Sequence, residues 1–101
     1  MRIIVMFDLP METSAERKVY AVFRKFLVKN GFLMLQKSIY CKIAQNSTAA
    51  DNLIANVRKN KPKEGIVQVL TITEKQYSKM EYIVGVRKSE VIDSDERLLI
   101  L

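Results

Sequence analysis

The sequence predicts an α+β domain with two helices on one face of an antiparallel sheet. Three observations predict it: an almost uninterrupted apolar segment at the start of the chain, two stretches with apolar residues at helical spacing, and a β-branched segment near residue 70. Extended and helical segments follow the order β-α-β-β-α-β, which is the ferredoxin-like arrangement. A chain of 101 residues is long enough for one such domain and too short for two, so we expect residues 1–101 to form a single domain.

The first strand is expected over residues 2–9, and its alternation places apolar side chains on both faces. Ile3, Val5, Phe7 and Leu9 point one way, whereas Arg2, Ile4, Met6 and Asp8 point the other. Two helices on one side can cover only one of these faces. A second copy of the chain would bury the other face, so we expect a homodimer that forms through the sheet faces.

The first helix is expected to begin at Thr13 or Ser14, which are good N-terminal caps, and to run to about Asn30, with Gly31 as its breaker. Its apolar face carries residues at helical spacing: Val19, Tyr20, Phe23, Phe26 and Leu27. The opposite face is basic throughout: Arg17, Lys18, Arg24, Lys25 and Lys29.

The second helix is expected to begin at Thr48, because Asp51 three residues later resembles a capping box, and to end near Asn60. Its apolar stripe consists of Ala50, Leu53, Ile54 and Val57. Further extended segments are expected over residues 32–43, with an interruption at 36–38, and over residues 66–73 and 81–86. A short helical turn is expected over residues 74–80, and residues 87–101 are expected to form a loop and a C-terminal strand.

The charge balance predicts a polyanionic partner. Seventeen basic residues against eleven acidic ones give a net charge of +6 and a pI near 9.6, which favours nucleic acid or an acidic surface; simple solubility is the alternative. No segment approaches the roughly 18 apolar residues of a membrane span, and no secretion signal is recognisable. The one cysteine, Cys41, excludes an internal disulfide and fits a reducing cytoplasm.

Asp8 is a charged residue at the end of an otherwise apolar strand, and its carboxylate needs an explanation. A charged group in apolar surroundings needs a partner, solvent or a metal ion. Strand parity sends Asp8 toward the expected dimer interface, where the same carboxylate of a second copy could approach it and Mg²⁺ could lie between the two. The alternative is that Asp8, together with Pro10, only shapes the turn.

Four segments, taken in order, resemble one known family: VMFDLP, ERKVYAVFRKFLVKNGF, LQKSIYCKI and GIVQVLTITEKQ. They cover nearly the whole chain and are similar to the small CRISPR-associated adaptation protein, the partner subunit of the CRISPR integrase. The C-terminal ERLLIL resembles the short strand that, in this family, pairs with the sheet of the other protomer. In its length and its lack of histidine, the chain resembles the version of this protein that is found beside type II systems.

The resemblance implies an obligate ferredoxin-like homodimer in the cytoplasm of a prokaryote. The dimer would bridge two dimers of the integrase subunit and lie along a DNA duplex that awaits insertion into the CRISPR array, in spacer acquisition. Family members have been described as Mg²⁺-dependent endonucleases, some on single-stranded RNA and some on duplex DNA. In integration the protein is thought to act as a scaffold that does not need this activity.

The resemblance also assigns roles to individual residues. Asp8 stands at the position of the family's metal-linked residue, which makes it the candidate catalytic and metal-binding residue. The basic pair early in the first helix maps to Arg17 and Lys18, and the basic pair after the fourth strand maps loosely to Arg87 and Lys88. In relatives these regions touch DNA phosphates, and nothing in this sequence resembles a base-reading motif.

Ser38 and Tyr40 are secondary candidates. Ser38 lies in the LQKSIY segment, which matches a family segment near the proposed nuclease site, and both hydroxyls could position a phosphate. A lone Ser or Tyr in a strand is more often structural. With one carboxylate per chain and no histidine, we expect nuclease activity to be weak or dispensable.

Two other functions remain open. One is a toxin-like ribonuclease of the same fold, which would cut RNA efficiently without an integrase. The other is a non-catalytic regulatory module, for which the sequence offers no phosphate-cradling glycine loop: its three glycines are well separated.

Overall fold

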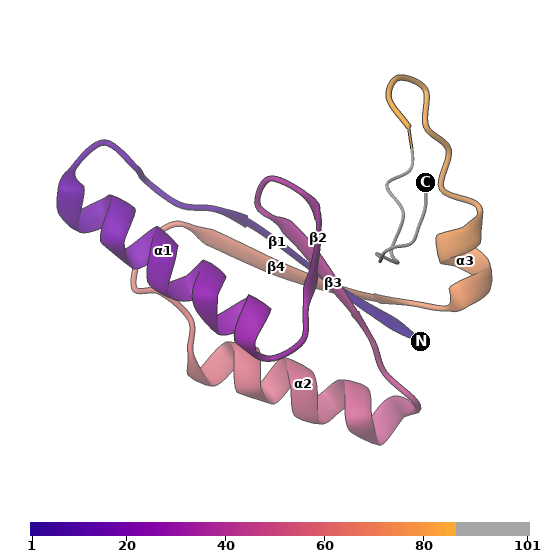
Figure 1. The fold of residues 1–101 in the computed structure, drawn as a ribbon. Coiled ribbons are helices and arrows are strands. Elements are labelled where there is room, and N and C mark those ends of the chain that lie inside the picture. Colours follow the sequence, from indigo (N-terminus) through magenta and orange to yellow (C-terminus); the bar gives the residue numbers. More distant parts are fainter. Residues whose placement is uncertain (87–101) are drawn as a thin grey trace.

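A computed structural model describes residues 1–86 of the chain. The expected loop and strand over residues 87–101, together with Arg87 and Lys88, therefore lie outside the described residues. The elements are β1 (Arg2–Asp8), α1 (Ser14–Lys29), β2 (Leu33–Gln36), β3 (Ile39–Ile43), α2 (Ser47–Lys59), β4 (Ile66–Ile72) and α3 (Glu74–Ser78). The sheet has the order β2-β3-β1-β4 with antiparallel neighbours (Figure 1). The predicted ferredoxin-like α+β fold is confirmed.

β1 is one of the two inner strands of the sheet, and its side chains alternate between the two faces as predicted. Its odd-numbered side chains enter the main core with α1 and α2: Ile3, Val5, Phe7 and Leu9. Phe23 and Leu27 of α1 are buried against them. Ile4 belongs to a second, smaller cluster on the opposite face, with Cys41 and Tyr77.

α1 begins and ends where the sequence predicts. The Thr13 side chain accepts the backbone N–H of Glu16, and the Glu16 carboxylate accepts the backbone N–H of Thr13, which completes a capping box. Asn30 is the C-terminal cap, and Gly31 follows with φ of +88°. The basic side chains of α1 are exposed as expected. Val19 is about half exposed because it lies at the margin of the apolar stripe.

The start of α2 differs from the prediction. Its N-terminal cap is Asn46, whose Oδ1 accepts the backbone N–H of Ala49 at 2.8 Å, so Thr48 lies inside the helix. Asparagine is as good an N-terminal cap as threonine or better, so the helix begins two residues earlier than predicted. The predicted end near Asn60 is confirmed, and Ala50 and Val57 are buried.

The interruption in the 32–43 segment is a bulged hairpin. The register between β2 and β3 shifts between Met34 and Gln36, and the turn residue Ser38 has φ of +68°. The predicted strand over 66–73 and the helical turn after it are also confirmed, with Thr73 capping α3.

The prediction of a strand over residues 81–86 is wrong. These residues form bends and irregular backbone, and Ile83, Val84 and Val86 are 82, 90 and 82% exposed. Apolar and β-branched composition favours a strand only where a neighbouring strand supplies hydrogen bonds and a face to pack on, and the described residues place none beside this segment.

The face of the sheet opposite α1 and α2 is only partly covered. Tyr77 of α3 packs there against Ile4 and Cys41, whereas Ile66 and Leu70 of β4 are about half exposed. Over the described range, no helix is long and apolar enough to cross a membrane.

Candidate functional site

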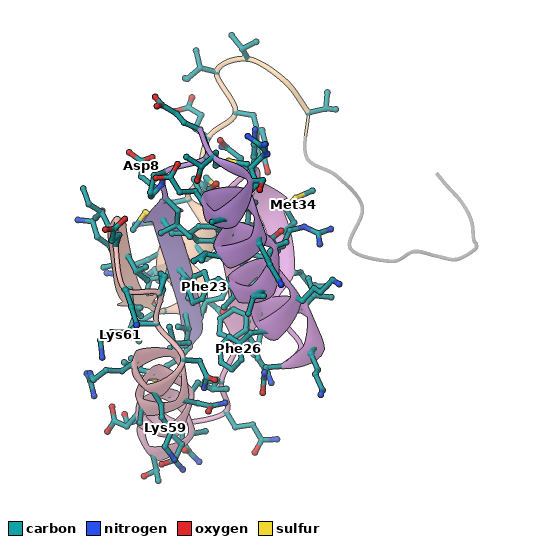
Figure 2. All side chains as sticks on the ribbon, turned by 90° about the vertical axis from the view of Figure 1, so that its left-hand side faces the viewer. Asp8, Phe23, Phe26, Met34, Lys59 and Lys61 are labelled. Carbon is teal, nitrogen blue, oxygen red and sulfur yellow. The ribbon has the colours of Figure 1, made fainter. Side chains whose placement is uncertain are left out.

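Asp8 is an exposed carboxylate at the end of the buried central strand. β1 pairs with β4 up to Asp8 opposite Ile66, so the backbone of Asp8 still belongs to the sheet. The strand enforces alternation, and the Asp8 side chain therefore leaves on the face away from the helices. Figure 2 shows Asp8 near the top of the view and Lys59, at the end of α2, near the bottom, whereas the loop that follows α2 leads back to Asp8 through Gly65.

Gly65 lies directly against this strand end. Its φ is +93°, and a β-carbon added there would stand 2.7 Å from both the Asp8 carbonyl oxygen and the Leu9 Cδ2 atom. Only glycine permits β4 to begin so close to the backbone of Asp8. In the sequence this glycine stands at the end of the charged segment KNKPKEG, residues 59–65, which marks a turn but not this close approach.

Ser38 is brought to the same end of β1. Its carbonyl accepts the backbone N–H of Phe7 at 3.0 Å, one residue before Asp8. The Ser38 and Tyr20 hydroxyls lie 3.0 Å apart and share a hydrogen bond. Sequence reasoning missed Tyr20 because it stands on the apolar stripe of α1. The available signal was that a buried tyrosine needs a partner for its hydroxyl.

Tyr40 is placed differently from the other candidates. It is 2% exposed and lies in the main core, with its ring stacked on that of Phe7 at a centroid distance of 5.8 Å. This position is that of a packing residue beneath the strand.

Arg17 and Lys18 lie in the first turn and a half of α1, after the loop that leaves Asp8. The Arg17 Nη1 atom donates to the carbonyl oxygens of Met11 and Glu12, at 3.1 and 2.9 Å. Arg17 thus fixes the loop between β1 and α1, while the neighbouring Lys18 is exposed. The basic pair Arg87 and Lys88 cannot be placed, since it lies outside the described residues.

Asp8 offers a metal ion one carboxylate per chain. In residues 1–86, no three His, Cys, Asp or Glu side chains are grouped so that they could hold a metal ion. Mg²⁺ is content with one or two carboxylates and several waters. One chain alone therefore supplies one of the carboxylates that such an ion would need, and a second carboxylate would have to come from another chain.

An ion pair lies at the other end of β1. Buried Arg2 forms a bidentate ion pair with Glu74, with an Nη2–Oε1 distance of 2.9 Å, and lies 3.8 Å over the Tyr77 ring. The hydrogen bonds from Arg2 hold the pKa of the Glu74 carboxyl below its ordinary value, and those to Glu74 raise the pKa of Arg2. This pair secures α3 to the sheet, far from Asp8 along the strand.

Comparison with known proteins agrees with the resemblance seen in the sequence. The family model described as CRISPR associated protein Cas2 matches residues 1–80. The CRISPR-associated endoribonuclease Cas2 of Treponema denticola is 54% identical over 101 residues, which covers 100% of both chains. The protein of the same name from Streptococcus mutans is 46% identical over 101 residues, covering 100% of this chain and 93% of that relative.

A solved structure agrees in fold. The crystal structure of Streptococcus pyogenes Cas2 matches with a TM-score of 0.62 and 17% identity, over 83% of this chain and 100% of that chain. At this identity the likeness shows the fold alone, whereas the family model and the full-length relatives establish the lineage. The chain belongs to the CRISPR-associated protein Cas2 family.

Proposed function

We propose that this chain is a divalent-cation-dependent endoribonuclease that serves in CRISPR adaptation as a homodimer. One observation carries the proposal: Asp8 is an exposed carboxylate on a rigid, central strand, in a chain 54% identical over its full length to a CRISPR-associated endoribonuclease. Mg²⁺ held there would activate water and steady charge on the phosphate. Asp8 would hold the ion, and the strand would fix the position of its carboxylate.

The incompletely covered face of the sheet supports the homodimer. Ile66 and Leu70 are about half exposed on that face, and Asp8 leaves the strand on the same side. A second copy packed there would bury these apolar side chains and bring two Asp8 carboxylates toward one ion.

Backbone recognition of nucleic acid belongs to the same proposal. The α1 surface is basic, with Arg17 and Lys18 near the Asp8 end, and Arg87 and Lys88 add a second pair. Such contacts neutralise phosphates without reading bases. The dimer would lie along a DNA duplex in the cytoplasm and bridge the two integrase dimers.

A second candidate function is that of a DNA scaffold without cleavage. The single candidate carboxylate, Asp8, and the absence of histidine from the sequence favour it, because histidine is the commonest general base and one carboxylate is not a full ligand set. Over residues 1–86, no three metal-ligating side chains gather to compensate.

The test uses wild type and Asp8→Ala with labelled single-stranded RNA and DNA duplex, each with Mg²⁺ or with a chelator. We expect wild type to cut only when Mg²⁺ is present, and to cut RNA faster than DNA. Asp8→Ala should cut neither substrate. Asp51→Ala, which removes an exposed carboxylate from α2, is the matched control and should cut like wild type. If wild type and Asp8→Ala bind the DNA duplex equally and neither cuts, Asp8 is structural and the protein is a scaffold.

A further inference from the structure

A hydroxyl pair ties α1 to the β2–β3 turn beside the end of β1. The Tyr20 and Ser38 hydroxyls lie 3.0 Å apart in a partly buried position. The Tyr20 ring also packs on Phe7, with centroids 5.6 Å apart. Tyr20 therefore contacts both the turn and the strand residue that precedes Asp8.

Ser38 holds a backbone conformation that a non-glycine residue rarely adopts. Its φ is +68°, and no other non-glycine residue among residues 1–86 has a positive φ. Such a conformation costs energy and persists only where surrounding contacts enforce it. The hydrogen bond between the Tyr20 and Ser38 hydroxyls is a contact of this kind, since it fixes the Ser38 side chain relative to α1.

The conformation of Ser38 matters for Asp8 because of its carbonyl group. The ladder between β1 and β3 ends at Met6 opposite Ile39. Beyond it, the Ser38 carbonyl accepts the Phe7 N–H at 3.0 Å. If Ser38 relaxed to negative φ, this carbonyl would turn away and the β3 side of the strand end would lose its support.

We propose that Tyr20 and Ser38 form a positioning pair, which holds the end of β1 so that the Asp8 carboxylate is set for binding a divalent cation. This inference rests on the proposed role of Asp8 and adds two residues to it. Neither hydroxyl touches the cation. They act through the backbone of Phe7, one residue before the carboxylate.

The experiment is a double-mutant cycle on the full chain, with Tyr20→Phe, Ser38→Gly and the double variant. The readouts are RNA cleavage with Mg²⁺ and, without RNA, Mn²⁺ affinity by electron paramagnetic resonance. Tyr20→Phe should lose about tenfold in cleavage, since small displacements of reacting groups have effects of this order, and should bind Mn²⁺ more weakly. In the Ser38→Gly background, the same substitution should change either quantity less than about twofold, because glycine adopts positive φ without help.

Two results would overturn the inference. One is unchanged Mn²⁺ affinity and cleavage in Tyr20→Phe despite a lower melting temperature, which is the mark of a merely structural bond. The other is an equal loss from Tyr20→Phe in both backgrounds, which would show that Tyr20 does not act through Ser38.

Two controls separate this inference from the proposed function. Asp8→Asn should abolish cleavage and weaken Mn²⁺ binding; if it changes neither, the role of Asp8 fails and the positioning pair fails with it. If Asp8→Asn behaves as expected and Tyr20→Phe does not, only the positioning pair is wrong. Ser78→Ala, which removes a 2.7 Å hydroxyl-to-carbonyl bond in α3, should leave both readouts unchanged.

Discussion

Gly65 leaves no room for a side chain beside Asp8: a β-carbon at position 65 would stand 2.7 Å from the Asp8 carbonyl oxygen. That oxygen belongs to the backbone of the central strand, so it cannot rotate out of the way as a flexible side chain would. The first residues of β4 and the last residue of β1 are thus fitted to each other at the position where the candidate carboxylate projects.

Gly65→Ala is therefore expected to lower the free energy of unfolding by about 2–4 kcal/mol, through backbone strain and overpacking together. Cleavage that depends on Asp8 should fall as well. Gly85→Ala is the matched control, because Gly85 also has positive φ (+96°) but nothing lies within 4 Å of its added β-carbon. Urea unfolding of both variants measures the difference, and equal stability of the two would contradict the close approach of Gly65 to the strand.

Stability should depend on pH through the Arg2–Glu74 pair. Arg2 lowers the pKa of the Glu74 carboxyl in the folded state, so this carboxyl stabilises the fold at pH values above its unfolded-state pKa. The stabilisation is lost as the pH falls through the lower, folded-state pKa. Glu74→Gln should therefore lower the melting temperature at about pH 7 and make little difference at about pH 3.

This comparison is made at one protein concentration, since association also shifts melting temperatures. Glu81→Gln, at an exposed glutamate beyond α3, serves as the control and should match wild type at both pH values. A Glu74→Gln effect that is equal at both pH values would show that the ion pair is not its cause.

Tyr40→Phe should leave RNA cleavage within about twofold of wild type. The ring is buried and stacked on Phe7, so the packing that supports β1 survives loss of the hydroxyl. Tyr40→Ala, in contrast, should cost about 3–5 kcal/mol of stability through the cavity it leaves. Cleavage assays and thermal unfolding on both variants test this. A tenfold loss in a normally stable Tyr40→Phe protein would assign the hydroxyl to the chemistry.

Lys18→Gln should reduce the salt dependence of duplex DNA binding. Removing the charge that neutralises one phosphate lowers the slope of log affinity against log salt concentration by about 0.9. Lys18 is preferable to Arg17 for this test, because Arg17 also holds the loop before α1 through the Met11 and Glu12 carbonyls. Lys79→Gln, at the end of α3, is the control. A slope unchanged by Lys18→Gln would remove this residue from the interface.

The parts of the fold that follow from local patterns could be predicted. The alternation of β1 assigned Phe7 and Asp8 to opposite faces, and Thr13 with Glu16 marked the start of α1. These signals lie within a few residues of each other and depend on backbone periodicity and capping chemistry. The predicted start of α2 was two residues too late, because Asn46 and Thr48 are both adequate N-terminal caps.

The parts that depend on distant residues could not be predicted. Tyr20 and Ser38 are 18 positions apart, and Arg2 and Glu74 are 72 apart. No periodicity links such pairs, and a tyrosine on an apolar stripe looks like one more core residue. The strand predicted over residues 81–86 failed for a related reason, because whether an apolar segment forms a strand is decided by its neighbours.

The central place of β1 also has a consequence for synthesis of the chain. Arg2 pairs with Ile43 on one side and with Ile72 on the other, so the first strand to leave the ribosome is the last to have both edges occupied. Until β4 emerges, the β4-facing edge of β1 presents unsatisfied N–H and carbonyl groups to other nascent chains. The sheet is therefore completed only after β4 has left the ribosome, and a truncated product that ends before residue 66 would carry an open edge that favours aggregation.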